Sequence, residues 1–292
     1  MSTAGMLHLP QITTVRPRDL VGEHPLLAFF AIAFGITWVY ELLCFGLLDL
    51  PELPWMLLAP FVPALSAVLV TRTIEGRSGV RALWQRVTLW RVGLRWYAFA
   101  LVVIPVLAVL SFVFLPDGTE NLPSSAVLIP PTYLVLIVVM FFLGGGQEEP
   151  GWRGFALPRM QERFGPLPAT VLLGLLWGVW HLPLFLWVPD YDNAGFGFVS
   201  ITATFLGFVG YSVALSLIMT WVFNHTRGSV FMAMLLHATA NANFALAPES
   251  QLAGTSVVLS IAVLALVILA ATRGQLGYRQ MPLAPATSAA DN

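Results

Sequence analysis

Apolar segments long enough to cross a lipid bilayer recur along this 292-residue chain. A helix needs about 20 mostly apolar residues to span the hydrocarbon core. In lipid, only helices and closed barrels satisfy every backbone polar group, so the pattern predicts an all-α polytopic membrane protein with one helical bundle. Eight spans are predicted, at about residues 26–48, 55–72, 95–116, 130–148, 167–188, 198–222, 230–247 and 252–271.

The amino-acid composition indicates that most of the protein surface contacts the lipid bilayer. Hydrophobic residues make up 58% of the sequence and charged residues 10%, with a mean hydropathy of +0.80. A soluble globular domain carries about 25% charged residues, so most of this surface is predicted to face something other than water. The formal net charge of -1 argues against nucleic acid as a partner. The single cysteine, Cys44, excludes an internal disulfide.

The basic residues indicate the orientation of the chain. All 14 are arginine, and in the eight-span arrangement they fall on one side, while the connections on the other side hold only acids. This is the positive-inside pattern, so both termini are predicted in the cytosol of a multi-pass plasma-membrane protein. The exclusive use of arginine favours a bacterial source. Residues 1–25 and 272–292 are predicted to be cytosolic tails, the second of them disordered, around a bundle of residues 26–271.

Ionisable residues inside the predicted spans are the candidates for function. Glu148 and Glu149 end span four, while His181 and His237 lie in the middle of spans five and seven. Carboxylates and imidazoles are costly in a bilayer, so these placements predict an active site built within the membrane. Glu41, inside span one, is the harder case, since a neutral acid or a polar pair across the bundle also explains it.

Helical spacing groups these residues with further polar and aromatic ones. Residues four apart share a helix face, which places Glu149 beside Arg153, Trp177 beside His181, and His237 beside Asn241. An interfacial ion pair and polar contacts between helices would explain each pair structurally. Three such pairs in neighbouring spans favour function over structure alone. Gly174 and Gly178 predict a close approach of another helix to span five.

The chemistry available to this set is the activation of water. A carboxylate near an imidazole can take a proton from water and return it to a leaving group. A second imidazole and an amide can donate hydrogen bonds to a developing oxyanion. Nucleophilic catalysis is disfavoured, because the sequence has no GxSxG motif and Cys44 is far from the histidines along the chain.

Three motifs in this region resemble those of the CAAX-protease and bacteriocin-processing family of intramembrane proteases. The run from Glu148 to Arg153 resembles the family's EExxxR motif, and the run from His237 to Asn241 its HxxxN motif. The run from Trp177 to His181 is similar to FxxxH, with tryptophan in place of phenylalanine. The resemblance covers roughly residues 140–245, with the motifs in the family's order.

The resemblance implies an eight-helix bundle with a cavity open to the cytosol and a core protease region at about residues 130–247. It implies hydrolysis of a peptide bond in a membrane-associated peptide or protein substrate. In that reaction Glu148 is the general base, assisted by His181, and His237 and Asn241 form the oxyanion site. The supporting residues are Glu149, Arg153 and Trp177.

Three alternatives are left open at this point. Glu148, His181 and His237 form a donor set that also suits catalytic zinc, although the chain has no HExxH motif and the water mechanism needs no metal or other cofactor. A non-catalytic immunity or chaperone-like membrane protein would retain the same residues. A proton-coupled transporter is less favoured, because the sequence shows no internal repeat.

One geometric difficulty follows from the predicted spans. Glu148 ends span four on the inner side, while His181 lies about fourteen residues into span five, or roughly 21 Å along a helix. Ideal spans would keep the two side chains apart. We therefore expect either that span five begins in the cytosol or tilts, or that the glycines at 144–146 bend the site inward.

Overall fold

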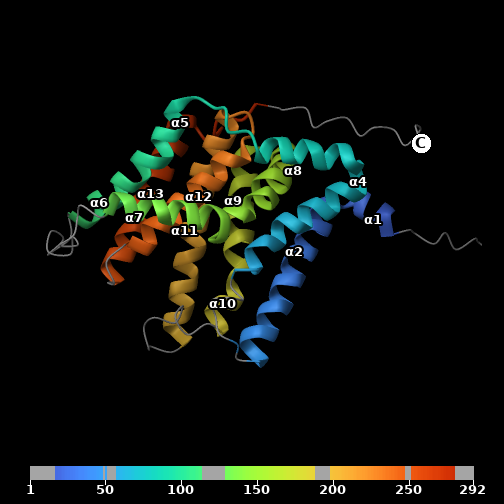
Figure 1. Ribbon diagram of the computed structural model, residues 1–292, viewed down its shortest axis with the longest axis horizontal. Helices are drawn as coiled ribbons and strands as arrows, with labels where there is room; N and C mark the ends of the chain where they lie inside the picture. The colour runs from blue at the N-terminus through green and yellow to red at the C-terminus, as the bar shows by residue number, and fades with distance from the viewer. Residues whose placement is uncertain are drawn as a thin grey trace, which may run out of the picture.

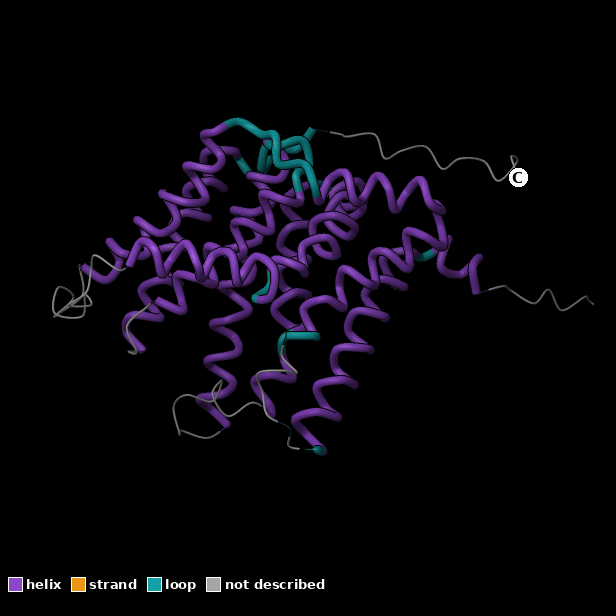
Figure 2. The backbone as a smooth tube through the Cα atoms, viewed as in Figure 1, coloured by secondary structure: helices purple, strands orange, loops and turns teal. Residues whose placement is uncertain are grey.

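The structure confirms the predicted all-α fold. It is a computed structural model that describes residues 17–48, 50, 57–113, 129–187, 198–246 and 251–279. Over these ranges every regular element is helical (Figure 2). The α-helices are α1 (Pro17–Glu23), α2 (Pro25–Glu41), α4 (Val62–Val87), α5 (Leu94–Ala98), α6 (Ile104–Val113), α7 (Ile129–Leu143), α8 (Leu157–Phe164), α9 (Pro166–Trp180), α10 (Leu182–Trp187), α11 (Phe198–His225), α12 (Val230–Leu246) and α13 (Gln251–Thr272). Short π-helical or 3-10 segments join several of them, at Leu42–Leu47, Ala59–Phe61, Phe99–Val103, Gly146–Glu148 and Pro150–Ala156.

The membrane spans agree broadly with the predicted eight. Among the described residues, six helical segments are long and apolar enough to cross a bilayer, and they are Pro25–Leu47, Leu94–Ser111, Pro131–Glu148, Pro166–Trp187, Ile201–His225 and Thr255–Thr272. The two other predicted spans correspond to α4 and α12. Helix α4 runs on into arginine-rich sequence, and α12 has 17 residues.

Both predicted tails contain ordered structure. Helix α1 lies in the first tail and packs against α4. In the second, Leu276 is fully buried and its carbonyl accepts a hydrogen bond from Nδ2 of Asn224, at 3.0 Å. The predicted disorder is therefore wrong for residues 273–279, because an apolar side chain and a carbonyl there find partners on the bundle. Residues 280–292 lie outside the described residues.

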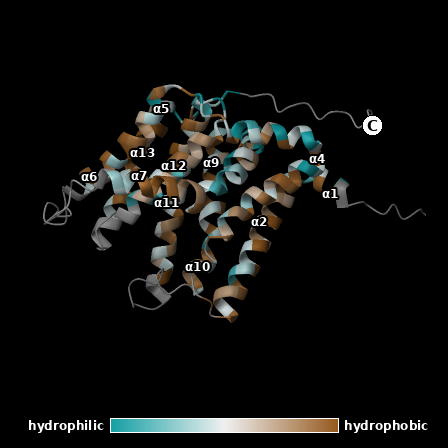
Figure 3. Ribbon diagram, viewed as in Figure 1, coloured by the Kyte–Doolittle hydropathy of each residue, from teal (hydrophilic) through white to brown (hydrophobic). Residues whose placement is uncertain are grey.

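The helices pack around one large cluster of buried hydrophobic side chains. Helix α7 runs across the molecule in Figure 1 and packs against α12, while α11 packs against both α9 and α13. Hydrophobic residues cover the outer helices α6, α7 and α13, and hydrophilic ones gather around α8 and the nearby end of α4 (Figure 3). There Arg159 of α8 forms an ion pair with Glu75 of α4.

The predicted close approach to span five occurs between α9 and α11. A Cβ atom added at Gly174 would lie 2.7 Å from the Cα atom of Val213, and one at Gly178 would lie 2.9 Å from the Cα atom of Val209. Only glycine allows the two backbones to lie this close. The contact places the face of α9 that carries Trp177 at a fixed position relative to α11.

Candidate active site

Glu148 enters the protein interior through a sharp turn after α7. Gly145 has a φ of 109° and a ψ of -24°, a left-handed conformation that residues other than glycine adopt only with strain. The chain then forms the short helical segments Gly146–Glu148 and Pro150–Ala156. Glu148 is 3% exposed and Glu149 is fully buried. The glycine turn thus carries Glu148 into the protein interior.

The same path removes the predicted separation between Glu148 and span five. From Glu148 the chain continues through the π-helical segment and α8 before α9 begins at Pro166. Helix α9 then returns, and Trp177 comes back beside Glu148. Glu148 does end its span, Pro131–Glu148, as predicted, but the chain that follows stays inside the protein. The charged residues after it made that stretch look like a solvent-exposed flank, whereas most of it is buried.

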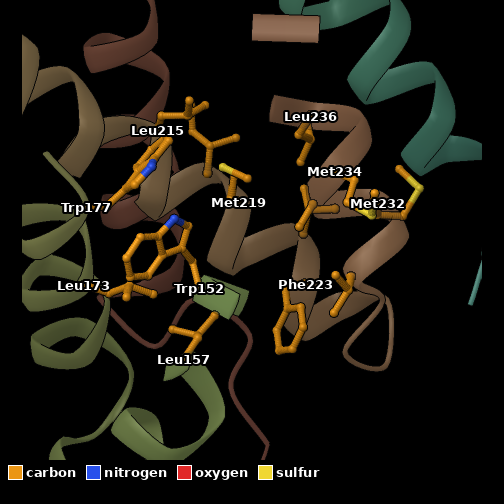
Figure 4. Close-up of a cluster of buried hydrophobic side chains, with 14 of the residues drawn as sticks. Trp152, Leu157, Leu173, Trp177, Leu215, Met219, Phe223, Met232, Met234 and Leu236 are labelled. Carbon is orange, nitrogen blue, oxygen red and sulfur yellow. The ribbon is translucent and has the colours of Figure 1, made fainter. Parts of the chain in front are cut away.

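Glu148 receives two hydrogen bonds on one carboxylate oxygen. Trp177 donates its Nε1–H to Oε2 at 2.8 Å, and Trp152 donates its Nε1–H to the same atom at 3.0 Å. Figure 4 shows both indoles in the buried cluster between the helices. No hydrogen bond from the part of the chain that the structure describes reaches Oε1. One oxygen of this buried carboxylate is therefore held, and the other is available for chemistry.

A second buried network surrounds Glu149. Arg153, also fully buried, donates from Nη1 to Oε1 of Glu149 at 3.1 Å and lies 3.1 Å from its Oε2. Nη2 of Arg153 donates to Oγ of Ser216 at 2.8 Å. Nδ1 of His237 lies 2.7 Å from Oε1 of Glu149. The spacing correctly predicted the contact between Glu149 and Arg153, but the pair is internal rather than interfacial.

Hydrogen bonds define which nitrogen of each histidine carries a proton. Nδ1 of His181 lies 2.9 Å from the carbonyl oxygen of Trp177, which can only accept, so this nitrogen donates. The partner of Nδ1 in His237 is the carboxylate of Glu149, which favours the same assignment. In both rings Nε2 is then the atom left for chemistry. His181 follows the last residue of α9, where Pro183 in the next turn lacks the N–H that would continue the helix.

The indole of Trp177 is the point at which the predicted residues meet. Besides its hydrogen bond to Glu148, its ring centroid lies 5.1 Å from that of His237 and 5.9 Å from that of His181. The guanidinium carbon of Arg153 lies 4.7 Å from the same ring. Residues from three separate segments of sequence therefore gather around one side chain.

His237 and Asn241 both face the glycine turn, as their spacing predicts. A Cβ atom added at Gly145 would lie 2.5 Å from Nε2 of His237 and 3.1 Å from Nδ2 of Asn241. Nδ2 of Asn241 donates to the carbonyl oxygen of Gly144 at 2.6 Å. This bond uses one of the two amide hydrogens and leaves the second as a potential donor.

The arrangement does not suggest a metal centre. Within the described residues, no group of three or more His, Cys, Asp or Glu side chains is placed to hold a metal ion. Glu148, His181 and His237 therefore gain no support as a zinc set, since their side chains gather around an indole ring rather than around one point.

Sequence reasoning missed two residues of the site. Trp152 was not selected, although it stands four residues after Glu148 and so follows the same spacing rule as the pairs that were selected. Ser216 lies on α11, 63 positions from Arg153, and no local pattern links the two. Glu41 is 3% exposed, and its Oε2 has no hydrogen-bond partner among the described residues, so the structure leaves its role unassigned.

Comparison with known proteins agrees with this geometry. Residues 130–243 match the model of the family described as type II CAAX prenyl endopeptidase Rce1-like. This region belongs to the CAAX-protease family. A curated relative, CAAX prenyl protease 2 of Methanococcus maripaludis, is 30% identical over 118 residues. The alignment covers 39% of this chain and 43% of the relative, less than half the length of either.

The matched CAAX-protease region contains every residue of the candidate site. It begins near the start of α7 and ends within α12, so it includes both carboxylates, both histidines and Asn241. Helices α2, α4 and α6 lie outside it. The family assignment therefore rests on the part of the chain that forms the site.

Proposed function

We propose that this chain is an intramembrane endopeptidase of the CAAX-protease type, which hydrolyses a peptide bond with water activated by Glu148 and His181. The observation that carries the proposal is the gathering of Glu148, His181 and His237 around Trp177, within the family region. A buried carboxylate that shares an indole neighbour with two imidazoles suits acid–base chemistry on water.

In the proposed reaction, Oε1 of Glu148 takes a proton from a water molecule while Nε2 of His181 accepts a hydrogen bond from the second hydrogen of that water. The water oxygen attacks the carbonyl carbon of the scissile peptide bond and forms a tetrahedral oxyanion. The C–N bond then breaks, and the amine leaves with the proton that Glu148 returns. The products are a carboxylic acid, which keeps the second hydrogen of the water, and an amine. A proton then passes from the acid to the amine, and Glu148 ends in its starting state.

The oxyanion is stabilised by His237 and Asn241. Since Nδ1 of His237 donates to Glu149, a second donor at Nε2 requires the imidazolium form. The second amide hydrogen of Asn241 completes the pair of donors.

The substrate is proposed to be a membrane-associated peptide that reaches the site from the cytosol. The distribution of the arginines supports cytosolic termini in a bacterial plasma membrane. The relative's name points to prenylated C-terminal CAAX peptides as the first compounds to test.

The test compares wild-type protein in lipid nanodiscs with the Glu148→Gln variant, using farnesylated CAAX peptides and a peptide library. Glutamine keeps the size of the side chain but cannot act as a carboxylate base, so the rate is expected to fall by at least about a hundredfold. Glu162→Gln, at an exposed glutamate of α8, is the matched control and should keep wild-type activity. Full activity of Glu148→Gln would refute the mechanism, and no cleavage by the wild type would favour a non-catalytic protein.

Gly145→Ala is expected to lower activity about a hundredfold. The added methyl group would lie 2.5 Å from Nε2 of His237, so the imidazole must move, and small displacements in an active site cost rate on this scale. Gly165→Ala is the matched control, because Gly165 also has a positive φ of 80° but its Cβ would meet nothing within 4 Å. Both variants should lose about 1–2 kcal/mol in unfolding experiments. Equal activity of the two variants would show that strain, rather than contact with His237, is responsible.

A further inference from the structure

The two hydrogen bonds to Glu148 come from groups that can only donate. Indole Nε1–H has no acceptor capacity, so neither Trp152 nor Trp177 can relay a proton. Both rings direct this group at Oε2, at 3.0 and 2.8 Å. An oxygen that accepts two such bonds has little lone-pair density left for water. The structure therefore distinguishes the two oxygens of the carboxylate.

The indoles themselves have little freedom to move. Trp152 is fully buried, and its ring lies 5.5 Å from that of Phe29 and 5.7 Å from that of Trp180. Trp177 is 2% exposed and packs against the guanidinium of Arg153. Donors fixed in this way hold a carboxylate in one orientation without reorganising during a reaction.

Trp177 also contacts the second group that handles the water. Its carbonyl oxygen accepts the Nδ1–H of His181 at 2.9 Å, which leaves Nε2 of that ring unprotonated. One residue therefore orients Glu148 through its side chain and selects the tautomer of His181 through its backbone. A phenylalanine at this position would keep the backbone contact and lose only the indole N–H.

We propose that Trp152 and Trp177 are positioning residues that hold Oε2 of Glu148 through two indole N–H groups, so that Oε1 is the atom that takes the proton from water. The inference rests on the proposed function, since it concerns the same base. It adds a role for Trp152, and it explains what the tryptophan at position 177 contributes that the phenylalanine of the FxxxH motif cannot.

The first test measures kcat and KM for Trp177→Phe, Trp152→Phe and the double variant. Both indoles are buried and are not expected to contact the substrate, so KM should stay within about twofold of wild type. Loss of one hydrogen bond to a charged group should lower kcat by about ten- to a hundredfold. The double variant should be slower than either single one. Trp38→Phe is the matched control, since its Nε1 donates at 3.0 Å to the carbonyl of Trp180 instead, and it should keep wild-type kcat.

The second test detects the hydrogen bonds without using activity. In ¹H–¹⁵N spectra of the ten indole groups, the signals of Trp152 and Trp177 are assigned by their absence from the two single variants. Both signals should shift upfield in Glu148→Gln, because a neutral amide is a weaker acceptor than a carboxylate. The Trp38 signal should not move.

The two tests separate the inference from the proposed function. Wild-type kcat in both single variants, or indole signals unmoved by Glu148→Gln, would overturn the positioning role while Glu148 could still be the base. Full activity of Glu148→Gln would overturn the proposed function, and the spectra would still report whether the indoles hold that side chain.

Discussion

Replacing Arg153 by methionine is expected to destabilise the protein by about 3–5 kcal/mol, the scale on which a broken buried ion pair destabilises proteins. Arg153 is fully buried, and its guanidinium contacts Glu149, Ser216 and the ring of Trp177. Methionine fills a similar volume but leaves Glu149 with no arginine to balance its charge. Reversible unfolding in detergent, followed by circular dichroism, measures the change in the free energy of unfolding.

The double variant Arg153→Met with Glu149→Gln tests whether the loss of stability comes from the unbalanced charge of Glu149. It removes both charges, so it should recover a large part of the stability that the single variant loses. Arg163→Met, at an exposed arginine of α8, controls for the loss of a positive charge and should change the stability by less than about 0.5 kcal/mol. A single variant at position 153 as stable as the wild type would show that the network contributes nothing to folding.

His237→Ala and Asn241→Ala are each expected to lower the rate of peptide hydrolysis by about a hundred- to a thousandfold. This is the cost of removing one donor from an oxyanion site. Both side chains reach the same glycine turn, as two donors to one oxygen would. Asn243→Ala is the matched control, because Asn243 lies on the same helix, α12, but its Nδ2 has no hydrogen-bond partner among the described residues. Activity of Asn241→Ala near that of the control would remove this residue from the oxyanion site.

The same assay separates an oxyanion role from metal binding. If His237 and Asn241 act directly on the substrate, protein treated with a strong chelator should keep its activity. We expect this result because no group of side chains within the described residues forms a metal-binding set. One zinc ion per chain, lost together with activity and restored by adding zinc, would contradict this mechanism and establish a metalloprotease.

Helix periodicity and hydropathy predicted those features of the site that depend on residues close together in the sequence. The period of the helix correctly paired Glu149 with Arg153 and placed His237 and Asn241 on one face. Hydropathy located six of the eight predicted spans to within about five residues. Both patterns involve only residues that are close in the sequence, so they can be recognised without the tertiary structure.

The parts that sequence reasoning missed depend on contacts between distant segments. The stretch after Glu148 contains charges, which hydropathy treats as exposed, yet Arg153 is buried because partners from α11 and the glutamate beside it satisfy its donors. The contact between Trp177 and Glu148 likewise depends on the left-handed turn at Gly145. A run of three glycines indicates a bend but not its direction.

The precision of this site depends on a helix contact that holds no reacting atom. Gly174 and Gly178 set how closely α9 lies to α11, and α9 carries the indole that orients the base. Ser216, on the opposing helix, anchors the guanidinium that packs on that indole. The position of α9 relative to α11 therefore determines how the carboxylate of Glu148 is oriented. Substitutions at the contact between α9 and α11 are therefore expected to affect the reaction as well as the packing, although this contact holds no reacting atom.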